Sequence, residues 1–563
     1  MLLFPFQLMY SQIEAWEVEH PLKMATTLSG NFAELRRNHF HGGIDFRTGG
    51  VENKPVYAID EGYIAKISIS PRGYGKMAYI NHSNGYTSLY AHLNGFVPKL
   101  DSVIRAKQYE KQSFEIEITF QPGEYVVRKG ALFALSGNTG SSGGPHLHFE
   151  IRKTDDNTML NPMELNEYFK FEDNHPPRIL AVKMYGMNDE SVVNSNREKK
   201  FQATAKTAKT RTLQGGADIK AWGEIGFSVK AYDYMTGTSF AYGPRIVKLY
   251  VDNLLISEVN LNNIKFNDSR AMNSFIDYSQ LMRSGEYYMK SFPDANSPLT
   301  IFKDTEHRGV YHINKERSYP VRYEVYDDFG LRDTISFTIQ GKKMEIPKNK
   351  KTNLTYLSYN ESHVFDQKDF LIYFPENALY NDLELGYKKI ASQKFCSPVY
   401  EIGNVEIPLH NYCDISIKVD KDTIDDKGKY FIAKLNANNI ITGSAGGVYI
   451  NVFDAFMVGK INAFGRFAVS TDTEKPIITP VNTTELHRKP YLRFKILDAL
   501  SGISSYNGYI DGEWVLFEYD AKTHTINCQM DKNMVKQNKS HEFKLVVADL
   551  CGNIATFEKT IYW

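Results

Sequence analysis

Cysteine is scarce in this chain of 563 residues, and all four copies lie in its last third. They do not form a Cys-x-x-Cys pair, which argues against a zinc site built from thiolates. Two pairings, Cys396–Cys413 and Cys528–Cys551, are open in an oxidising compartment. Four free thiols are an equally good interpretation, so the sequence leaves the disulfide state open.

The chain also lacks an excess of charge and a long apolar run. Lys+Arg and Asp+Glu number 66 each, so no global field attracts DNA or RNA, and we expect no nucleic-acid partner. No stretch approaches the roughly 20 apolar residues that span a bilayer, so we expect no transmembrane segment. The apolar start, residues 1–12, resembles the end of a secretory signal peptide without its basic n-region. We interpret it as a clipped signal segment and expect an exported protein of the periplasm, cell envelope or medium.

Tyrosine and phenylalanine, in contrast, are abundant at 36 and 34 copies. Aromatic residues favour strands over helices, and a chain of this length predicts three or four domains. We therefore expect a mainly β protein.

One short stretch, Gly143–Arg152, combines a turn with a strand pattern. Two glycines and a proline end any helix, and the alternation that follows is typical of a half-buried strand. His146, His148 and Glu150 then share one face, while the apolar residues between them share the other.

A second stretch, Asn38–Phe46, places His41 and Asp45 on one face of an extended chain, with Gly43 between them leaving space for a metal. A third, Tyr86–Leu93, alternates so that Ser88, Tyr90 and His92 share a face. Hairpin signals surround these segments, and residues 97–128 are interpreted as an insertion with its own strand at Phe114–Phe120. The glycine-rich loop at 136–144 lacks the Gly-Lys-Ser/Thr ending of a phosphate-binding loop, so we reject that interpretation.

Together these strands present four histidines and an aspartate, which suit a catalytic metal. Catalytic zinc commonly takes three protein ligands and leaves one position for water. Two histidines and one carboxylate would satisfy it, and two further histidines remain for acid–base work or for hydrogen bonds to the ligands.

Three motifs in this order, His-x-Gly-x-Asp at 41–45, Tyr-Ala-His-Leu at 90–93 and Gly-Pro-His-Leu-His-Phe-Glu at 144–150, resemble the M23 peptidase family. This family comprises the LytM/lysostaphin-type zinc endopeptidases of bacterial cell walls, and the stretch at 30–41 is similar to Bacteroidota-type multidomain members. The resemblance covers about residues 30–165. It implies that His41, Asp45 and His148 bind Zn²⁺ and that His92 and His146 line the scissile bond. The roles of base and oxyanion partner stay open between these two histidines.

Other polar residues of this region are expected to be structural. His39 is interpreted as a surface or structural residue, with a hydrogen bond to a metal ligand as the alternative, and His82 as part of a turn. Glu150 is expected to orient a neighbour by a hydrogen bond, and Tyr74 and Tyr90 to pack across strands rather than line a substrate groove.

Beyond a Pro-Pro linker near residue 176, strands alternate with short turns, and an apolar strand followed by Asp and then Gly recurs. We predict an M23-type antiparallel β catalytic domain followed by β-sandwich modules, the last of them immunoglobulin-like. The expected boundaries are 1–12 for the signal segment, 13–172 for the peptidase domain, and 177–342, 354–470 and 474–563 for the sandwiches.

The function expected on this basis is zinc-dependent hydrolysis of peptide cross-links in peptidoglycan. The sandwiches would space the catalytic domain from a surface or bind an envelope protein or glycan. The alternatives are a catalytically silent M23-like scaffold or activator of another wall hydrolase, and a surface-binding β-sandwich protein. The sequence leaves open which cross-link is cut, whether the groove is blocked, and the oligomeric state.

Overall fold

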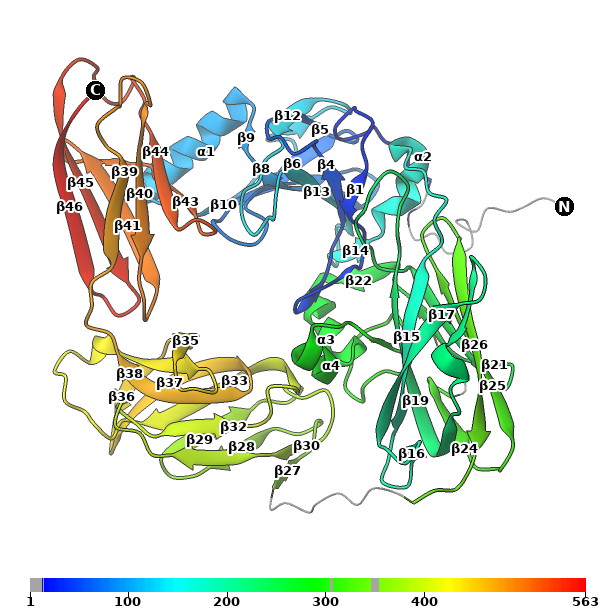
Figure 1. Ribbon diagram of the computed structural model, residues 1–563. Coiled ribbons are helices and arrows are strands. Elements are labelled where there is room, and N and C mark those ends of the chain that lie inside the picture. The colour runs from blue at the N-terminus through cyan, green and yellow to red at the C-terminus, as the bar shows by residue number, and fades with distance from the viewer. Residues whose placement is uncertain (1–12, 14, 304–306, 346–353) are drawn as a thin grey trace.

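Strands dominate the computed structural model, which describes residues 13, 15–303, 307–345 and 354–563 and contains four β-rich domains (Figure 1). The prediction of a mainly β fold is confirmed. The expected signal segment, residues 1–12, lies outside the described residues, as does most of the polar stretch at 342–353.

The first domain is built on one long antiparallel sheet whose strand order differs from their order in the chain. In sheet order its strands are β1 (Leu28–Gly30), β4 (Ile44–Arg47), β13 (His146–Lys153), β8 (Tyr86–Leu93), β7 (Lys76–Asn81), β6 (Gly62–Ile69) and β10 (Ile116–Thr119). Shorter strands complete the domain: β11 (Val126–Val127), β14 (Thr158–Leu160), the pair β2 (Leu35–Arg36) and β3 (His39–Phe40), and the small sheet β5 (Pro55–Tyr57), β12 (Leu132–Leu135) and β9 (Gly95–Phe96). The order places β4, β13 and β8 side by side, so three strands far apart in sequence meet at the middle of the sheet.

The insertion at 97–128 differs from its prediction in one respect. Its strand is present as β10, but a helix, α1 (Pro98–Lys111), precedes it, and the sequence analysis did not anticipate this helix. Pro98 at the first turn is compatible with a helix start, and Leu100 and Ile104 are buried one turn apart. These two residues are a weak apolar stripe, which explains why the helix is hard to predict.

The second domain packs its strands around β19, and it contributes a strand to the sheet of the first. Its main strands are, in sheet order, β16 (Val192–Val193), β19 (Lys220–Tyr232), β15 (Arg178–Gly186), β17 (Glu198–Ala205), β18 (Thr210–Leu213), β26 (Arg332–Gly341), β25 (Ser318–Tyr326), β20 (Ile246–Val251) and β21 (Leu254–Asn260), with β23 (Met289–Lys290) and β24 (Val310–Ile313) beside β19. Two short helices, α3 (Met272–Phe275) and α4 (Tyr278–Ser284), follow β22 (Asn263–Lys265). Strand β22 pairs with β14, so backbone hydrogen bonds cross the boundary between the two domains.

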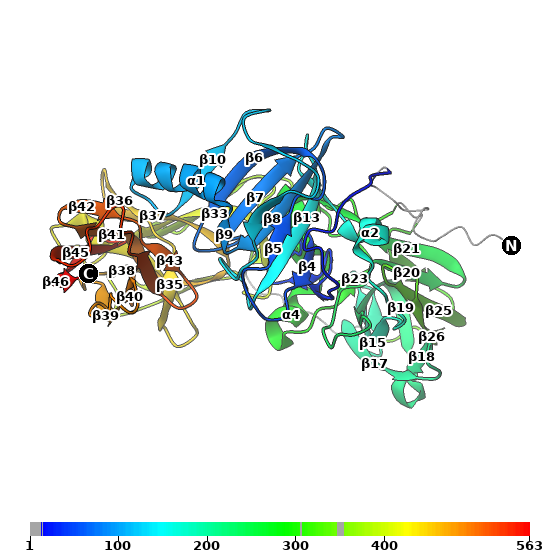
Figure 2. The same cartoon turned by 90° about the horizontal axis from the view of Figure 1, so that it is seen from above.

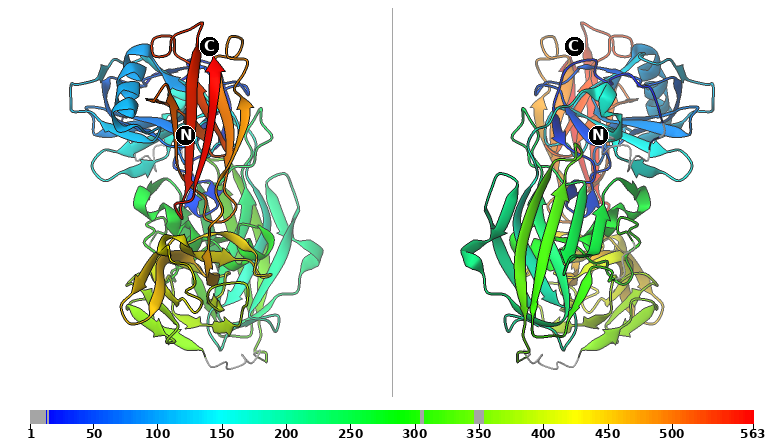
Figure 3. Two further views of the ribbon diagram at one scale, coloured as in Figure 1. Left: turned by 90° about the vertical axis from the view of Figure 1, so that its left-hand side faces the viewer. Right: turned by 90° about the vertical axis from the view of Figure 1, so that its right-hand side faces the viewer.

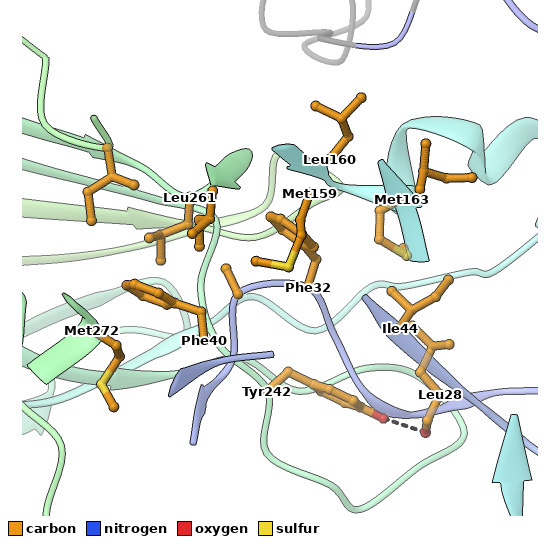
Figure 4. Close-up of a cluster of buried hydrophobic side chains, with 14 of the residues drawn as sticks. Leu28, Phe32, Phe40, Ile44, Met159, Leu160, Met163, Tyr242, Leu261 and Met272 are labelled. Atoms are coloured by element: carbon orange, nitrogen blue, oxygen red, sulfur yellow. Dashed lines mark hydrogen bonds between the residues drawn. The ribbon is translucent and has the colours of Figure 1, made fainter. Parts of the chain in front are cut away.

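The first two domains also share a hydrophobic core (Figure 4). Phe32, Phe40 and Met159 of the first domain lie close to Leu261 and Met272 of the second, and all five are buried. Separate modules joined only by a linker would each close their own core. The short segment at 170–177 therefore connects two domains that are packed as one unit.

The third and fourth domains are each made of two facing sheets. The third has one sheet of β28 (His363–Asp366), β29 (Phe370–Phe374), β33 (Pro408–Lys418), β37 (Ala455–Ala463) and β36 (Val448–Asn451), a second of β31 (Tyr387–Ile390), β32 (Val399–Ile402), β38 (Gly465–Thr471), β34 (Tyr430–Leu435) and β35 (Ile441–Ser444), and the pair β27 (Thr355–Leu357) and β30 (Leu383–Leu385). The fourth has sheets of β39 (Ile477–Asn482), β40 (Tyr491–Leu497), β44 (Thr525–Gln529) and β43 (Glu518–Asp520), and of β42 (Glu513–Val515), β41 (Ile503–Ile510), β45 (Ser540–Asp549) and β46 (Ile554–Tyr562). The immunoglobulin-like character of the fourth domain stays a prediction. All four cysteines are free thiols in the described part of the chain.

The four domains form a ring, because the fourth returns to the first (Figures 1 and 2). At this junction Lys76 lies 2.9 Å from Glu518, and the ammonium of Lys522 donates to the carbonyl of Asn138. Figure 3 shows that the fourth domain lies directly above the third in its left-hand view. Three junctions of the ring are thus covalent, and the one between the fourth and first domains is not.

Candidate metal centre and active site

Two of the predicted ligands are direct neighbours across paired strands. In the register of β4 and β13, Asp45 stands opposite His148, so their side chains rise from the same face of the sheet. His41 lies in the turn just before β4 and reaches the same point. The exposed fractions of the three residues are 2%, 3% and 3%, so the ligand side chains are almost fully buried.

The three side chains converge on a common point. His41 Nε2 lies 3.0 Å from Asp45 Oδ1 and 2.9 Å from His148 Nδ1, and His148 Nδ1 lies 2.9 Å from Asp45 Oδ1. In a tetrahedral zinc site with bonds of about 2.1 Å, neighbouring ligand atoms are about 3.4 Å apart. The triangle therefore has the donor types and nearly the spacing of a three-ligand zinc site, and these residues fit the ion.

Hydrogen bonds behind the ligands fix which ring nitrogen faces the centre. His41 Nδ1 donates to the carbonyl of Asn31 at 2.6 Å, and His148 Nε2 donates to Glu150 Oε1 at 2.8 Å. Because a carbonyl can only accept, the proton of His41 is on Nδ1, and its Nε2 presents a lone pair. An imidazole held in this way by an acceptor on its far nitrogen is the usual arrangement of a metal-binding histidine.

Glu150 is the centre of the network behind His148. It is fully buried, its Oε1 also accepts from Tyr74 Oη at 2.6 Å, and its Oε2 accepts from Arg152 Nε at 2.6 Å. Burial alone would raise the pKa of this carboxyl, but Arg152 and His148 hold it well below the ordinary value. Glu150 therefore stays charged and orients His148, the role that its place on the strand predicts.

Arg36 is a neighbour of the site that the sequence analysis missed. Its guanidinium donates to Asp45 Oδ2 at 2.7 Å, on the oxygen that does not face the histidines. Burial would raise the pKa of Asp45, whereas the surrounding histidines lower it well below the ordinary value. Arg36 comes from a two-residue strand, β2, and no periodic pattern in the sequence marks it.

His92 and His146 face the same centre without belonging to the triangle. His92 Nδ1 donates to the carbonyl of Thr139 and His146 Nδ1 to that of Gly144, both at 2.8 Å. Each ring is thus anchored through Nδ1 with its Nε2 turned away from that carbonyl, and the two ring centroids are 4.8 Å apart. His146 Nε2 lies 3.4 Å from Asp45 Oδ1 and is buried without a hydrogen-bond partner among the described residues.

The backbone of His92 corrects one expectation from the sequence. Strand alternation placed Tyr90 and His92 on one face, but Tyr90 stands opposite Phe149 and packs into the core with it. His92 has a left-handed φ of 56°, which breaks the alternation and turns its ring to the face of His148. Such a conformation is uncommon for a residue with a side chain and is concentrated at functional sites.

The remaining predicted residues lie away from the centre. His39 is exposed, and its ring contacts the carbonyl of Arg37, as expected of a surface histidine. His82 is buried rather than part of an open turn, because its two nitrogens bond to Glu61 O and Ser88 Oγ.

The clustered histidines ionise differently, although burial by itself lowers the pKa of each. Burial lowers the pKa of His41 to about 4 and that of His92 to about 3. For His148 the burial effect is outweighed by hydrogen bonds to Asp45 and Glu150, which raise its pKa to about 9. His92 is therefore neutral at pH 7, as its hydrogen bonding indicates.

The loop that carries Thr139 and Gly144 is held against a neighbouring turn. A Cβ on Gly140 would come within 2.3 Å of Gly75 N and 2.4 Å of Gly73 O, and Gly140 has a φ of 70°. Only glycine fits at such a close backbone approach. The turn at 73–75 thus fixes the loop that anchors both His92 and His146.

Comparison with known proteins agrees with this geometry. The family model of peptidase family M23 matches residues 39–109, which include His41, Asp45 and His92, while His146 and His148 follow beyond the match. An uncharacterised metalloprotease of Haemophilus influenzae is 31% identical over 138 residues. The chain carries a peptidase M23 domain. The DD-carboxypeptidase/endopeptidase Mpg of Neisseria meningitidis is 33% identical to the chain over 112 residues.

These similarities are confined to part of each protein. The match to the Haemophilus relative covers 23% of this chain and 24% of that protein. The match to the Neisseria relative covers 20% of each. The chain therefore spans only about a quarter and a fifth of the length of these relatives. Among solved structures, the catalytic domain of lysostaphin from Staphylococcus simulans is similar at 21% identity, covering 25% of this chain and 92% of that one with a TM-score of 0.19. A zinc-containing peptidase from Vibrio cholerae is 26% identical to this chain. The match covers 24% of this chain and 36% of that one, with a TM-score of 0.18.

Outside the M23 domain, a Zu5-like domain matches residues 354–472, which contain both sheets of the third domain. None of the helices in the described part of the chain has the length and apolar character needed to cross a bilayer.

Proposed function

We propose that this protein is a zinc metallo-endopeptidase that hydrolyses peptide cross-links of bacterial peptidoglycan. The observation that carries the proposal is the triangle of His41, Asp45 and His148, with ligand atoms 2.9–3.0 Å apart, beside two histidines that are each anchored through Nδ1. A silent scaffold would have no reason to keep both the ligand set and the two further imidazoles in working orientation.

Zn²⁺, when bound by these three residues, would polarise a peptide carbonyl and lower the pKa of a water molecule toward about 7. The protein's own contribution is to move the proton. His146 Nε2 is buried, lies 3.4 Å from Oδ1 of the ligand Asp45 and lacks a hydrogen-bond partner among the described residues, so we assign the removal of the water proton to the neutral form of His146. Its Nδ1 stays bonded to the carbonyl of Gly144, which keeps the ring in place while it carries charge.

His92 has a different role in this proposal. Burial and the neighbouring histidines lower its pKa to about 3, so it remains neutral near pH 7 and acts as a hydrogen-bond acceptor. It can receive a hydrogen bond from the protonated His146 or from a substrate N–H, and in either case it orients the reacting groups. The rigid anchor at Thr139 suits such a positioning role.

The substrate class rests on the relatives. The Neisseria relative is named a DD-carboxypeptidase/endopeptidase, and its similarity to this chain covers a fifth of its length. Peptidoglycan lies outside the cytoplasm, so the proposal includes export to the periplasm, envelope or medium. The β-sandwich domains at 177–342, 354–470 and 474–563 would space the catalytic domain or bind an envelope protein or glycan.

Mass spectrometry of the products tests the proposal. Purified full-length protein, with and without added zinc, is incubated with cross-linked peptidoglycan, and the released fragments are analysed. We expect new peptide termini that require zinc, and these termini also identify the bond that is cut. The absence of new termini from zinc-loaded protein would favour the scaffold or activator alternative.

His146→Ala is the matched control for this experiment. The variant keeps all three metal ligands, so zinc should remain bound at one equivalent, while turnover falls by about 10²–10⁴-fold through loss of the base. Unchanged turnover would remove His146 from the mechanism without affecting the assignment of the metal ligands.

A further inference from the structure

A second group of carboxylates lies at the junction between the M23 domain and the second domain. Asp173 belongs to the connecting segment after α2 (Asn166–Phe169), Asp233 follows β19, and Asp327 follows β25. Each offers one oxygen within 4.8 Å of the others. Two of them, Asp233 and Asp327, belong to the recurring pattern of an apolar strand, an aspartate and a glycine turn.

Each carboxylate has one oxygen that no donor satisfies. Asp173 Oδ2, Asp233 Oδ1 and Asp327 Oδ2 are buried and lack hydrogen-bond partners within the described residues. The exposed fractions of Asp233 and Asp327 are 3% and 1%, and the side chain of Asp173 is fully covered. A buried carboxylate is ordinarily paired or bound to a metal, because desolvation without compensation is strongly unfavourable.

The other oxygens are used to fix the side chains in position. Asp327 Oδ1 accepts from the amides of Phe329 and Leu331, both at 2.8 Å. Asp173 Oδ1 accepts from the amide of Thr236 at 3.0 Å. The free oxygens of Asp327 and Asp173 are therefore held in place by the backbone rather than left to rotate.

Basic side chains do not neutralise the group. In the described part of the chain, neither lysine nor arginine forms an ion pair with any of the three carboxylates, and the half-exposed His175 is 3.5 Å from the bonded oxygen of Asp173. Arg245 pairs with Glu164 at 3.4 Å and with Asp328 at 3.9 Å instead.

We propose that Asp173, Asp233 and Asp327 bind a calcium ion that ties the M23 domain to the second domain. Ca²⁺ takes oxygen ligands at about 2.3–2.6 Å, so two ligands on opposite sides of one ion are about 4.8 Å apart, and one oxygen of each of the three residues lies within this span. Three carboxylates favour calcium over magnesium, which retains several waters and uses one or two carboxylates.

The site also lies on a short path to the metal centre. The amide and carbonyl of Asp233 pair with those of Tyr242 at 2.9 Å, and the next residue, Gly243, bonds to both side-chain atoms of Asn31 at 2.7 and 2.9 Å. The carbonyl of Asn31 is the acceptor that orients His41. Tyr242 adds a hydrogen bond to the carbonyl of Leu28 (Figure 4). An ion at Asp233 therefore fixes the loop that supports a ligand of the catalytic metal.

A third group, Asp472, Asp498 and Asp549, stands at the start of the fourth domain but differs in one respect. Both oxygens of Asp472 and both of Asp549 accept hydrogen bonds from amides of the chain. We do not extend the proposal to it, and it supplies the control.

The test measures calcium binding to the zinc-loaded full-length protein by calorimetric titration with CaCl₂. Thermal unfolding with and without calcium measures the change in Tm. Asp233→Asn/Asp327→Asn removes two charges at nearly constant shape. We expect the wild type to bind calcium and to gain several degrees in Tm, and the double variant to lose at least tenfold in affinity together with that gain. In calcium-free buffer the double variant should be at least as stable as the wild type, because the wild-type carboxyls must take up protons on folding at pH 7 and the amides need not. A purely structural role would instead lower its stability.

Asp498→Asn is the matched control, since Asp498 also ends a strand before a glycine turn. This variant should keep the calcium-induced gain in Tm that the double variant loses. The proposal is overturned if millimolar CaCl₂ leaves the Tm of the wild type unchanged, or if the double variant keeps the full gain. An equal gain from MgCl₂ at the same concentration would overturn the assignment to calcium.

Discussion

At the scale of single residues, the metal centre depends on anchored imidazoles. His41, His92 and His146 each donate one ring N–H to a backbone carbonyl, and His148 donates to Glu150. These bonds orient the four rings before any ligand arrives, so their second nitrogens already point to one place. Such preorganisation removes the need to reorient groups during reaction.

Replacement of His148 by Ala should remove zinc and activity together, because a site with three protein ligands loses a third of them. His39→Ala is the matched control: it removes a histidine of the same domain that is exposed and bonded only to the carbonyl of Arg37 among the described contacts. We expect about one zinc per chain in the control and much less in His148→Ala, measured by elemental analysis. Full zinc content in His148→Ala would show that the ligand set is wrong.

The residues of the centre could be predicted from the sequence because strand alternation and spacing are short-range properties. The triangle of His41, Asp45 and His148 follows from two such segments and the M23 resemblance. Arg36 could not be predicted in this way, since its contact with Asp45 depends on how the short strands β2 and β3 fold back. Its role is decided by tertiary structure alone.

At the scale of elements, the site is shaped by places where strands stop being regular. The end of β8 turns His92 to the face of the metal ligands through a left-handed backbone, and regular alternation would have buried this ring with Tyr90. The hairpins of the first domain follow local glycine signals and were predictable. The helix α1 and the inversion at His92 were not, because neither has a strong local pattern.

The close contact between the loop around Gly140 and the turn at 73–75 leads to a testable prediction. In Gly140→Ala the new methyl group would clash with the backbone of Gly73 and Gly75, and the residue would be strained at a φ of 70°. We expect displacement of the loop that anchors His92, with zinc retained and turnover reduced by about tenfold or more. Gly143→Ala is the control, because a Cβ there meets nothing within 4 Å and the backbone is not left-handed. Equal activities of the two variants would contradict this view of the loop.

The carboxylates of the proposed calcium site predict a pH dependence of stability. Burial holds the pKa of Asp233 at about 9 and of Asp327 at about 8, whereas both titrate near 4 in an unfolded chain. Between these values the folded state binds more protons, so the free energy of unfolding falls as pH rises. Asp173 and Asp328 add to the effect, and Arg245 opposes it at Asp328.

We therefore expect the Tm of calcium-free protein to fall between pH 5 and pH 8 more steeply than that of Asp233→Asn/Asp327→Asn. Added calcium should flatten the wild-type profile, because the ion takes the place of the protons. The measurement is calorimetry at each pH in both buffers. Parallel profiles for the two proteins without calcium would show that these carboxyls do not titrate in this range.

At the scale of the whole molecule, the M23 domain is held from two sides. The second domain supports the backbone of Asn31 behind His41, and the fourth domain contacts Asn138 in the loop before His146. The sequence predicted strand-rich modules in a row, since each carries its own local patterns. It could not predict that the last module contacts the first, because that contact joins residues more than 380 apart, as in the pair of Asn138 and Lys522.

The junction between the fourth and first domains should be the weakest in the ring. Its ion pair, Lys76 with Glu518, is partly exposed, and such pairs contribute about 0–1 kcal/mol. Glu518→Lys should open the ring and increase the radius of gyration in small-angle scattering, with a larger effect at low salt. Glu513→Lys, an exposed site in the same domain, is the control. An unchanged radius in Glu518→Lys would show that other contacts, such as Tyr109 against Trp514, hold the junction.

A closed circuit of domains restricts what can reach its inner side. The four domains can separate without breaking the chain only at a junction that lacks a peptide bond. That junction lies between the fourth and the first domain, so the circuit can open and close there as a reversible contact.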